Sequence, residues 1–195
     1  MRLKLALAPP ALLALSACFG GGRAPDQLLT LTAAEPRPVA TPRSAGQGEA
    51  ITVAVPSLPQ ALRTTRIPVY VNETTIQYLT DAVWVEQPGP LFARLLGDTI
   101  AARTGRVVLD PGQYSHDPGT RITGTLARFG LDPNNMQVVI VYDAAMARGG
   151  PTGGVVTNRF EARVPVAEAT PAAVAPALNQ AANQLAAEVA AWVAG

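Results

Sequence analysis

The sequence predicts an α+β domain in which two amphipathic helices pack on one face of a mainly antiparallel β-sheet. Three long runs of alternating apolar and polar residues, at 121–131, 136–143 and 155–164, are separated by segments rich in Gly, Pro, Asn and Asp. Such runs favour an antiparallel meander. Two other segments, 90–104 and 171–192, carry apolar residues at three- and four-residue steps, which is typical of helices with one buried face.

Shorter strands are predicted ahead of this meander. Alternating branched residues at 51–55 end at Pro56, and a turn-like trio at 72–74 separates the apolar segments 68–71 and 75–79, which favours a hairpin. The last run of the meander carries polar residues on one side, while Val156 shares the apolar side with Phe160. We therefore expect one face of the sheet to contact solvent.

Local signals mark the ends of both helices. Pro90 suits the first turn of the first helix, and Gly105 can take the left-handed conformation that closes it. Thr170 and Pro171 are typical of the N-cap and first position of the second helix.

The first 18 residues predict export and lipidation. Arg2 and Lys4 precede an apolar run at 5–15, which is much shorter than the ~20 residues that span a bilayer and is typical of a cleaved signal. Leu15-Ser16-Ala17-Cys18 resembles the lipobox of bacterial lipoproteins, in which the cysteine thiol takes a diacylglycerol and the chain is cut just before it. Cys18, the only cysteine, is therefore the predicted lipidation site. The alternative is a plain secretory signal with an incidental cysteine.

These signals divide the chain into three parts. Residues 1–17 are the predicted signal peptide, 18–49 the lipidated N-terminus with a flexible tether rich in Pro and Gly, and 50–195 the folded domain. Within the tether, 28–31 is predicted as a short edge strand. An extended tether would reach tens of ångströms from the lipid.

Phe19, the residue after the predicted lipidation site, indicates which membrane holds the anchor. Gram-negative lipoproteins that stay at the inner membrane commonly carry aspartate directly after the lipidated cysteine. By that resemblance, Phe19 favours an anchor in the outer membrane with the domain on its periplasmic face.

Charge argues against several classes of function. The first 17 residues hold two of the 15 basic and none of the 14 acidic residues, so the rest of the chain has a net charge of about −1. Without a basic surplus there is no electrostatic footprint for nucleic acid. No later apolar run is long enough to cross a membrane. With Cys18 acylated, no disulfide can form within the chain, so the fold must rest on apolar burial.

No catalytic constellation, metal site or cofactor is predicted. His116, the only histidine, lies in a polar loop beside Asp117 and has no second histidine or cysteine to join it at a metal, so we expect a solvated loop residue. A Ser-His-Asp set would have to use the same histidine. The glycine-rich segment 149–154 lacks the Gly-Lys-Ser/Thr ending of a phosphate-binding loop, and its place between two strands favours a hairpin.

The aromatic residues Tyr70, Tyr78 and Trp84 are expected mostly in the core or on the sheet. A sharper hypothesis is that some of them line a surface that docks a partner, because Trp and Tyr concentrate at the hot spots of protein interfaces. The candidate partner-docking residues are Tyr70, Tyr78, Trp84 and Glu86.

Over most of its mature length the chain resembles the ABC-type transport auxiliary lipoprotein family. The most specific part is 78–86, followed by the helix with Leu91, Leu95 and Leu96. The other matching features are the lipobox, the 28–31 segment, the proline-rich gap, Ile51-Thr52-Val53, Arg66-Ile67 and Thr104-Gly105. A departure is Asp26-Gln27-Leu28, where many relatives carry an aromatic residue. The resemblance implies an α+β domain and a place beside ABC permease and MCE-domain proteins that move lipids between the two membranes of Gram-negative bacteria.

Three functions follow as hypotheses. The favoured one, implied by the resemblance, is a non-catalytic membrane-anchored lipoprotein that docks on an MCE-domain protein or its ABC permease/ATPase complex. The second is a periplasmic carrier that holds acyl chains in an apolar cavity between helices and sheet. The third is a periplasmic hydrolase that depends on His116. A homo-oligomer, such as a ring seated on a ring-shaped conduit, is a further hypothesis that no residue pattern establishes.

Overall fold

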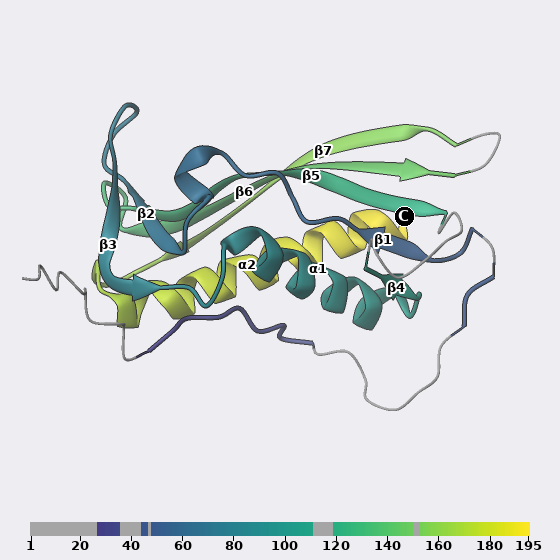
Figure 1. The fold of residues 1–195 in the computed structure, drawn as a ribbon, viewed down its shortest axis with the longest axis horizontal. Helices are drawn as coiled ribbons and strands as arrows, with labels where there is room; N and C mark the ends of the chain where they lie inside the picture. The colour runs from purple at the N-terminus through teal and green to yellow at the C-terminus, as the bar shows by residue number, and fades with distance from the viewer. Residues whose placement is uncertain (1–26, 36–43, 47, 111–118, 150–152) are drawn as a thin grey trace, which may run out of the picture.

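The computed structural model describes residues 27–35, 44–46, 48–110, 119–149 and 153–195. In these ranges the chain forms one seven-stranded sheet and two α-helices (Figure 1). The strands are β1 (Ile51–Val53), β2 (Arg66–Tyr70), β3 (Ile76–Val83), β4 (Val108–Leu109), β5 (Thr120–Asp132), β6 (Gln137–Arg148) and β7 (Val155–Pro165). The helices are α1 (Pro88–Thr104) and α2 (Pro171–Ala194), and a short 3-10 helix, η1, spans Gln60–Leu62. The predicted signal peptide, Cys18 and His116 lie outside the described residues.

Strand β5 organises the sheet. One of its edges pairs with β6 along its whole length. The other edge pairs with β1 at one end, from Thr120 to Ile122, and with β2 at the other end, at Leu131. The sheet continues through β4 beside β1, β3 beside β2, and β7 beside β6.

The α+β class and the packing of two helices against the sheet are confirmed, but the sheet is mixed and not mainly antiparallel. β5, β6 and β7 form the predicted antiparallel meander, and β2 and β3 form the predicted hairpin. β1 instead pairs in parallel with β4 and β5, and β2 pairs in parallel with β5. The long connection between β1 and β5 contains α1, which allows the two strands to run in the same direction.

Burial explains why the pattern of β1 was misleading. All three of its residues are buried, which is typical of a parallel strand covered on both faces. Three residues are too few for their alternation to distinguish this case from a strand with one wet face. In the meander the expected pattern holds better: Val138, Ile140 and Tyr142 of β6 are fully buried. Val156, which we expected on the apolar side of β7, is 51% exposed.

The two helices lie side by side against one face of the sheet (Figure 1). Two edge-to-face aromatic pairs join the layers: Phe92 of α1 meets Tyr142 of β6 at a centroid distance of 5.2 Å, and Trp192 of α2 meets Phe160 of β7 at 5.6 Å. α1 begins at Pro88, two residues before the predicted start. It ends as predicted at Gly105, whose φ of 70° is left-handed.

Residues 27–35 run along the helices, and Figure 1 draws them below α1 and α2. Leu29 forms an isolated parallel bridge with Trp84, directly after β3. This part of the predicted tether is thus in contact with the folded domain.

Candidate functional site

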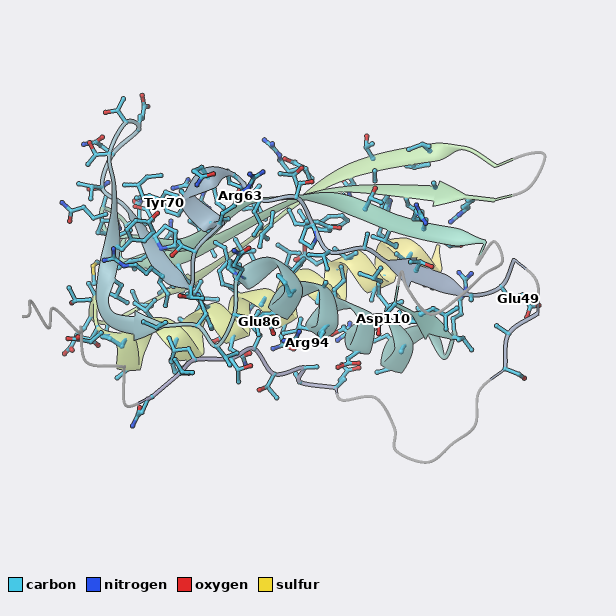
Figure 2. All side chains as sticks on the ribbon, viewed as in Figure 1. Glu49, Arg63, Tyr70, Glu86, Arg94 and Asp110 are labelled. Carbon is cyan, nitrogen blue, oxygen red and sulfur yellow. The ribbon has the colours of Figure 1, made fainter. Side chains whose placement is uncertain are left out.

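The structure places the four candidate docking residues in three environments. Tyr70 and Tyr78 lie on the same face of the β2–β3 hairpin, because the register pairs Tyr70 with Ile76 and Pro68 with Tyr78. Trp84 follows β3, and Glu86 precedes α1. Figure 2 shows Tyr70 at the hairpin and Glu86 near Arg94, beside α1.

Trp84 is a core residue. It is 1% exposed, and its indole ring meets Phe129 edge to face at a centroid distance of 5.7 Å. Its backbone N–H donates to the carbonyl of Thr65 at 2.8 Å. The indole fills interior volume that a smaller side chain would leave empty, so in this structure Trp84 serves packing and does not reach a partner.

Glu86 forms an ion pair with Arg94 of α1. The hydrogen bond that Arg94 donates to this carboxylate raises the pKa of the guanidinium. Both side chains are more than a third exposed, so the pair adds little stability. The carboxylate lies near the first turn of α1, where the helix dipole favours negative charge.

Two arginines that were not among the predicted docking residues lie over the tyrosine rings of the hairpin. The guanidinium carbon of Arg66 is 4.5 Å from the centroid of Tyr78, and that of Arg128 is 4.2 Å from the centroid of Tyr70. Both distances fall within the range of cation–π attraction. We refer to these four side chains, Tyr70, Tyr78, Arg66 and Arg128, as the tyrosine–arginine surface.

A β-bulge in β5 turns Arg128 toward Tyr70. The ladder between β5 and β6 shifts its register around Ala127, which is the extra residue. Before the bulge the fully buried apolar residues of β5 are even-numbered, as at Ile122, and after it they are odd-numbered, as at Phe129. This change of phase places Arg128 on the face of the sheet that carries Tyr70.

Close packing of β2 against β5 fixes the position of Tyr70. Its phenol oxygen accepts a hydrogen bond from the backbone N–H of Phe129 at 3.1 Å. Burial raises the pKa of the Tyr70 phenol, so the hydroxyl is neutral at physiological pH. Gly130 permits this approach, because a Cβ atom there would lie 2.2 Å from the carbonyl oxygen of Pro68.

An open groove of about 740 Å³ lies beside Tyr70 at the ends of β2, β3 and β5. It is lined by Tyr70, Asn72, Glu73, Ile76, Arg128, Asp132, Asn134 and Asn135. A hydrogen bond from the Asn135 amide is the main cause that holds the pKa of Asp132 below its usual value. The groove therefore offers carboxylates, amides and one guanidinium, which are groups suited to a polar protein segment.

The part of the chain that the structure describes holds no cluster of three or more His, Cys, Asp or Glu side chains able to bind a metal ion. Neither of the helices in this part has the length and apolar character needed to cross a bilayer. The loop with His116 lies outside the described ranges.

These observations define an α+β domain whose mixed sheet presents tyrosine and arginine side chains at its surface. Residues 29–190 match the family model for the ABC-type transport auxiliary lipoprotein component. The chain therefore belongs to this family, and it is an auxiliary lipoprotein component of an ABC-type transport system. The family predicted from the sequence is confirmed.

Solved structures support the fold. The crystal structure of a Xanthomonas campestris protein of the DUF330 family superposes with a TM-score of 0.70 at 18% identity, covering 86% of this chain and 94% of that one. A second crystal structure, of an uncharacterized protein, gives a TM-score of 0.61 at 12% identity over 86% of this chain and 97% of that one. Comparison with curated proteins gave no match.

Proposed function

We propose that this protein is a membrane-anchored periplasmic lipoprotein and a non-catalytic adaptor of an MCE-type ABC transport system that moves lipids between the inner and outer membranes. The observation that carries the proposal is the tyrosine–arginine surface on a chain of the auxiliary lipoprotein family. Tyrosine and arginine are enriched among the residues that dominate interface energies. An adaptor needs such a surface and an anchor, and it needs no reacting group.

The anchor is the proposed lipid on Cys18. Each buried acyl methylene contributes about 0.8 kcal/mol, so two or more chains hold a protein on a bilayer stably. Phe19 in the next position favours the outer membrane, with the domain in the periplasm. On this proposal the partner is an MCE-domain protein or its permease/ATPase complex, rooted in the opposite membrane.

The chemistry of the surface indicates what the partner must offer. The guanidinium groups of Arg66 and Arg128 carry five N–H donors each, more than the contact with one tyrosine side chain can use. Carboxylates on the partner would pair with these donors, and apolar side chains would cover the rings. We therefore expect an acidic patch with apolar residues at its centre on the partner.

The filled interior supports an adaptor better than a lipid carrier. Among the described residues, large aromatic side chains are fully buried in the core between helices and sheet; they are Trp84, Phe92, Phe129 and Tyr142. A lipid tail would have to displace them. A second open groove, of about 410 Å³, lies between α1 and the strands β1 and β4. Its lining includes Arg94, Asp98 and Asp110, so a tail placed there would desolvate charge.

A binding experiment tests the docking role. The mature chain with Cys18→Ser is used to capture the purified MCE-domain protein and, separately, the permease/ATPase complex. Tyr78→Ala is expected to weaken capture, whereas Tyr78→Phe, which keeps the ring under Arg66, is expected to retain it. Failure to capture any of these components, with the domain folded, would contradict the proposal.

Mass spectrometry tests the anchor independently. Protein from a Gram-negative host is expected to begin at Cys18 with acyl chains attached, and Cys18→Ser is expected to leave the membrane fraction. A bare thiol at Cys18 in the natively expressed protein would contradict lipid anchoring while leaving the docking experiment valid.

A further inference from the structure

Residues 29–35 form an extended strap on the helices. Leu29, Leu31 and Ala33 are partly buried and pack against the core, while Thr30 and Thr32 between them are exposed. This alternation with a period of two is that of a strand with one buried face. The strap is thus seated by apolar contact along its length.

Backbone hydrogen bonds hold the first end of the strap beside β3. The N–H of Leu29 donates to the carbonyl of Val83, and the N–H of Val85 donates to the carbonyl of Leu29, both at 2.8 Å. Leu29 therefore occupies the place of a short neighbouring strand at this point.

Two asparagines of α2 hold the middle of the strap. The N–H of Thr32 donates to Oδ1 of Asn179 at 2.8 Å, and the N–H of Ala34 donates to Oδ1 of Asn183 at 2.7 Å. Nδ2 of Asn183 in turn donates to the carbonyl of Thr32 at 2.9 Å. The Asn183 amide therefore bonds Thr32 and Ala34 as the backbone of an adjacent strand would.

An ion pair fixes the far end. Nη2 of Arg103, in the last turn of α1, lies 2.8 Å from Oε1 of Glu35. The contacts advance along both helices in chain order, since the strap passes Asn179 before Asn183 and reaches Arg103 last. Its N-terminal end therefore lies at the end of the domain that carries the β2–β3 hairpin (Figure 1).

We infer that this strap sets the distance and the orientation of the domain relative to its membrane. It directs the end of the domain that carries the tyrosine–arginine surface toward the bilayer. The inference rests on the proposed lipid at Cys18. Leu29, the first residue of the strap, follows Cys18 by eleven residues, and a fully extended chain covers about 36 to 40 Å over that number. The leash between lipid and strap is thus this short segment and not the whole of 18–49.

The sheet is longer than the distance that this leash can cover. β5 has 13 residues and is therefore about 43 Å long, which exceeds the reach of the leash. The hairpin end and its tyrosine–arginine surface lie toward the bilayer, and the end where β6 leads into β7 points away from it. A partner must consequently extend to within a few tens of ångströms of the anchoring membrane to dock.

The strap can be tested without lipid. In the mature chain with Cys18→Ser, the amides of Thr32 and Ala34 are expected to be protected from hydrogen exchange. Asn179→Ala combined with Asn183→Ala should accelerate their exchange roughly two- to tenfold, which is the ratio that the usual strength of one such bond gives for each amide. The matched control is Gln180→Ala combined with Gln184→Ala, at exposed positions of the same helix, which should leave the exchange unchanged. Equal protection in both double variants would overturn the clamp.

A second experiment places the domain on a bilayer. In the acylated protein, a dye is attached through Glu73→Cys at the hairpin or through Thr157→Cys on β7, and energy transfer to acceptor-labelled lipid headgroups is measured in proteoliposomes. Transfer should be stronger from the hairpin, and the asparagine double variant should reduce the difference. Equal transfer, or stronger transfer from β7, would overturn the orientation.

Mass spectrometry and energy transfer together separate the inference from the proposed function. Absence of acyl chains by mass spectrometry would overturn the anchor and the orientation together, whatever the exchange data show about the strap. Acylation with equal energy transfer would overturn the orientation alone.

Discussion

The guanidinium carbon of Arg128 lies 4.2 Å from the ring centroid of Tyr70, which joins β5 to β2 on the face of the sheet that carries the hairpin tyrosines. The phenol oxygen of Tyr70 also accepts a hydrogen bond from the N–H of Phe129, the residue after Arg128. Tyr70 is therefore held at both its ring and its hydroxyl. A partner would meet a surface that is already ordered, which lowers the entropy cost of binding.

Replacing Arg128 by methionine should weaken docking without unfolding the domain. The substitution keeps an apolar stem over the Tyr70 ring and removes the charge. We expect a loss of about 1 to 2 kcal/mol, or roughly 5- to 30-fold in affinity for the partner, measured by titration. The control is Arg159→Met on β7, whose guanidinium pairs with Asp143. Unchanged affinity in Arg128→Met would show that the pair plays no part in docking.

Adding a methyl group at Gly124 should destabilise the domain strongly. A Cβ atom there would lie 2.2 Å from the carbonyl oxygen of Asp143 and 2.7 Å from the ring of Tyr142. Relief of this overlap should cost about 1 to 3 kcal/mol or more in urea unfolding. Gly154→Ala is the matched control, because nothing lies within 4 Å of a Cβ atom at that position. Similar losses in both variants would contradict the steric account.

The contribution of Asp132 to stability should disappear in acid. Its folded pKa lies below the ordinary value of 3.8, mainly because of the Asn135 hydrogen bond. A lowered folded pKa gives stability that is fully present above the unfolded pKa and is lost as the pH falls through the folded pKa. Asp132→Asn should therefore lower the free energy of unfolding at pH 7, and the difference from the wild type should shrink below about pH 4. A difference that grew in acid would contradict this sign.

Trp84→Ala should lower the stability of the domain and should remove no direct contact with the partner. Removing a fully buried indole should cost about 3 to 5 kcal/mol, measured by thermal or urea unfolding. Any loss of capture should follow the fraction of unfolded protein. Normal stability combined with abolished capture would contradict this account and show that Trp84 takes part in docking.

Long periodic segments made most of the fold predictable. The meander strands and both helices extend over ten or more residues each, so their periods are legible in the chain. The parallel pairing of β1 was not predictable, because this strand has three residues and its partners β4 and β5 come more than 50 residues later. Pairing across such separations depends on the position of α1, which the sequence pattern leaves open.

The candidate site was predicted only in part. Tyr70 and Tyr78 were identified by residue type, but their arginine neighbours were not. The position of Arg128 depends on the bulge at Ala127 and on the contact between β2 and β5, and that of Arg66 depends on the register between β2 and β3. The bulge did leave a signal: the apolar positions of β5 change from even to odd numbers between Leu126 and Phe129. Such a change of phase within one strand indicates an inserted residue.

The two asparagines of α2 left a signal as well. Their polarity indicates a solvated face, yet asparagine is a poorer helix former than glutamine, which occupies the neighbouring positions Gln180 and Gln184. Two asparagines four residues apart stand on one side of a helix, where their amides can bond a chain laid along it. Only the position of the strap distinguishes that role from plain solvation.

Strand β7 pairs only with β6 in the described part of the sheet, so its other side is a free edge. Its exposed positions include Arg159, Glu161 and Arg163, and the strand ends at Pro165, which has no N–H to offer. Charged side chains and proline are devices that discourage a second sheet from adding on. For copies crowded by their lipids into the two dimensions of a bilayer, this edge would oppose unregulated stacking into fibrous aggregates.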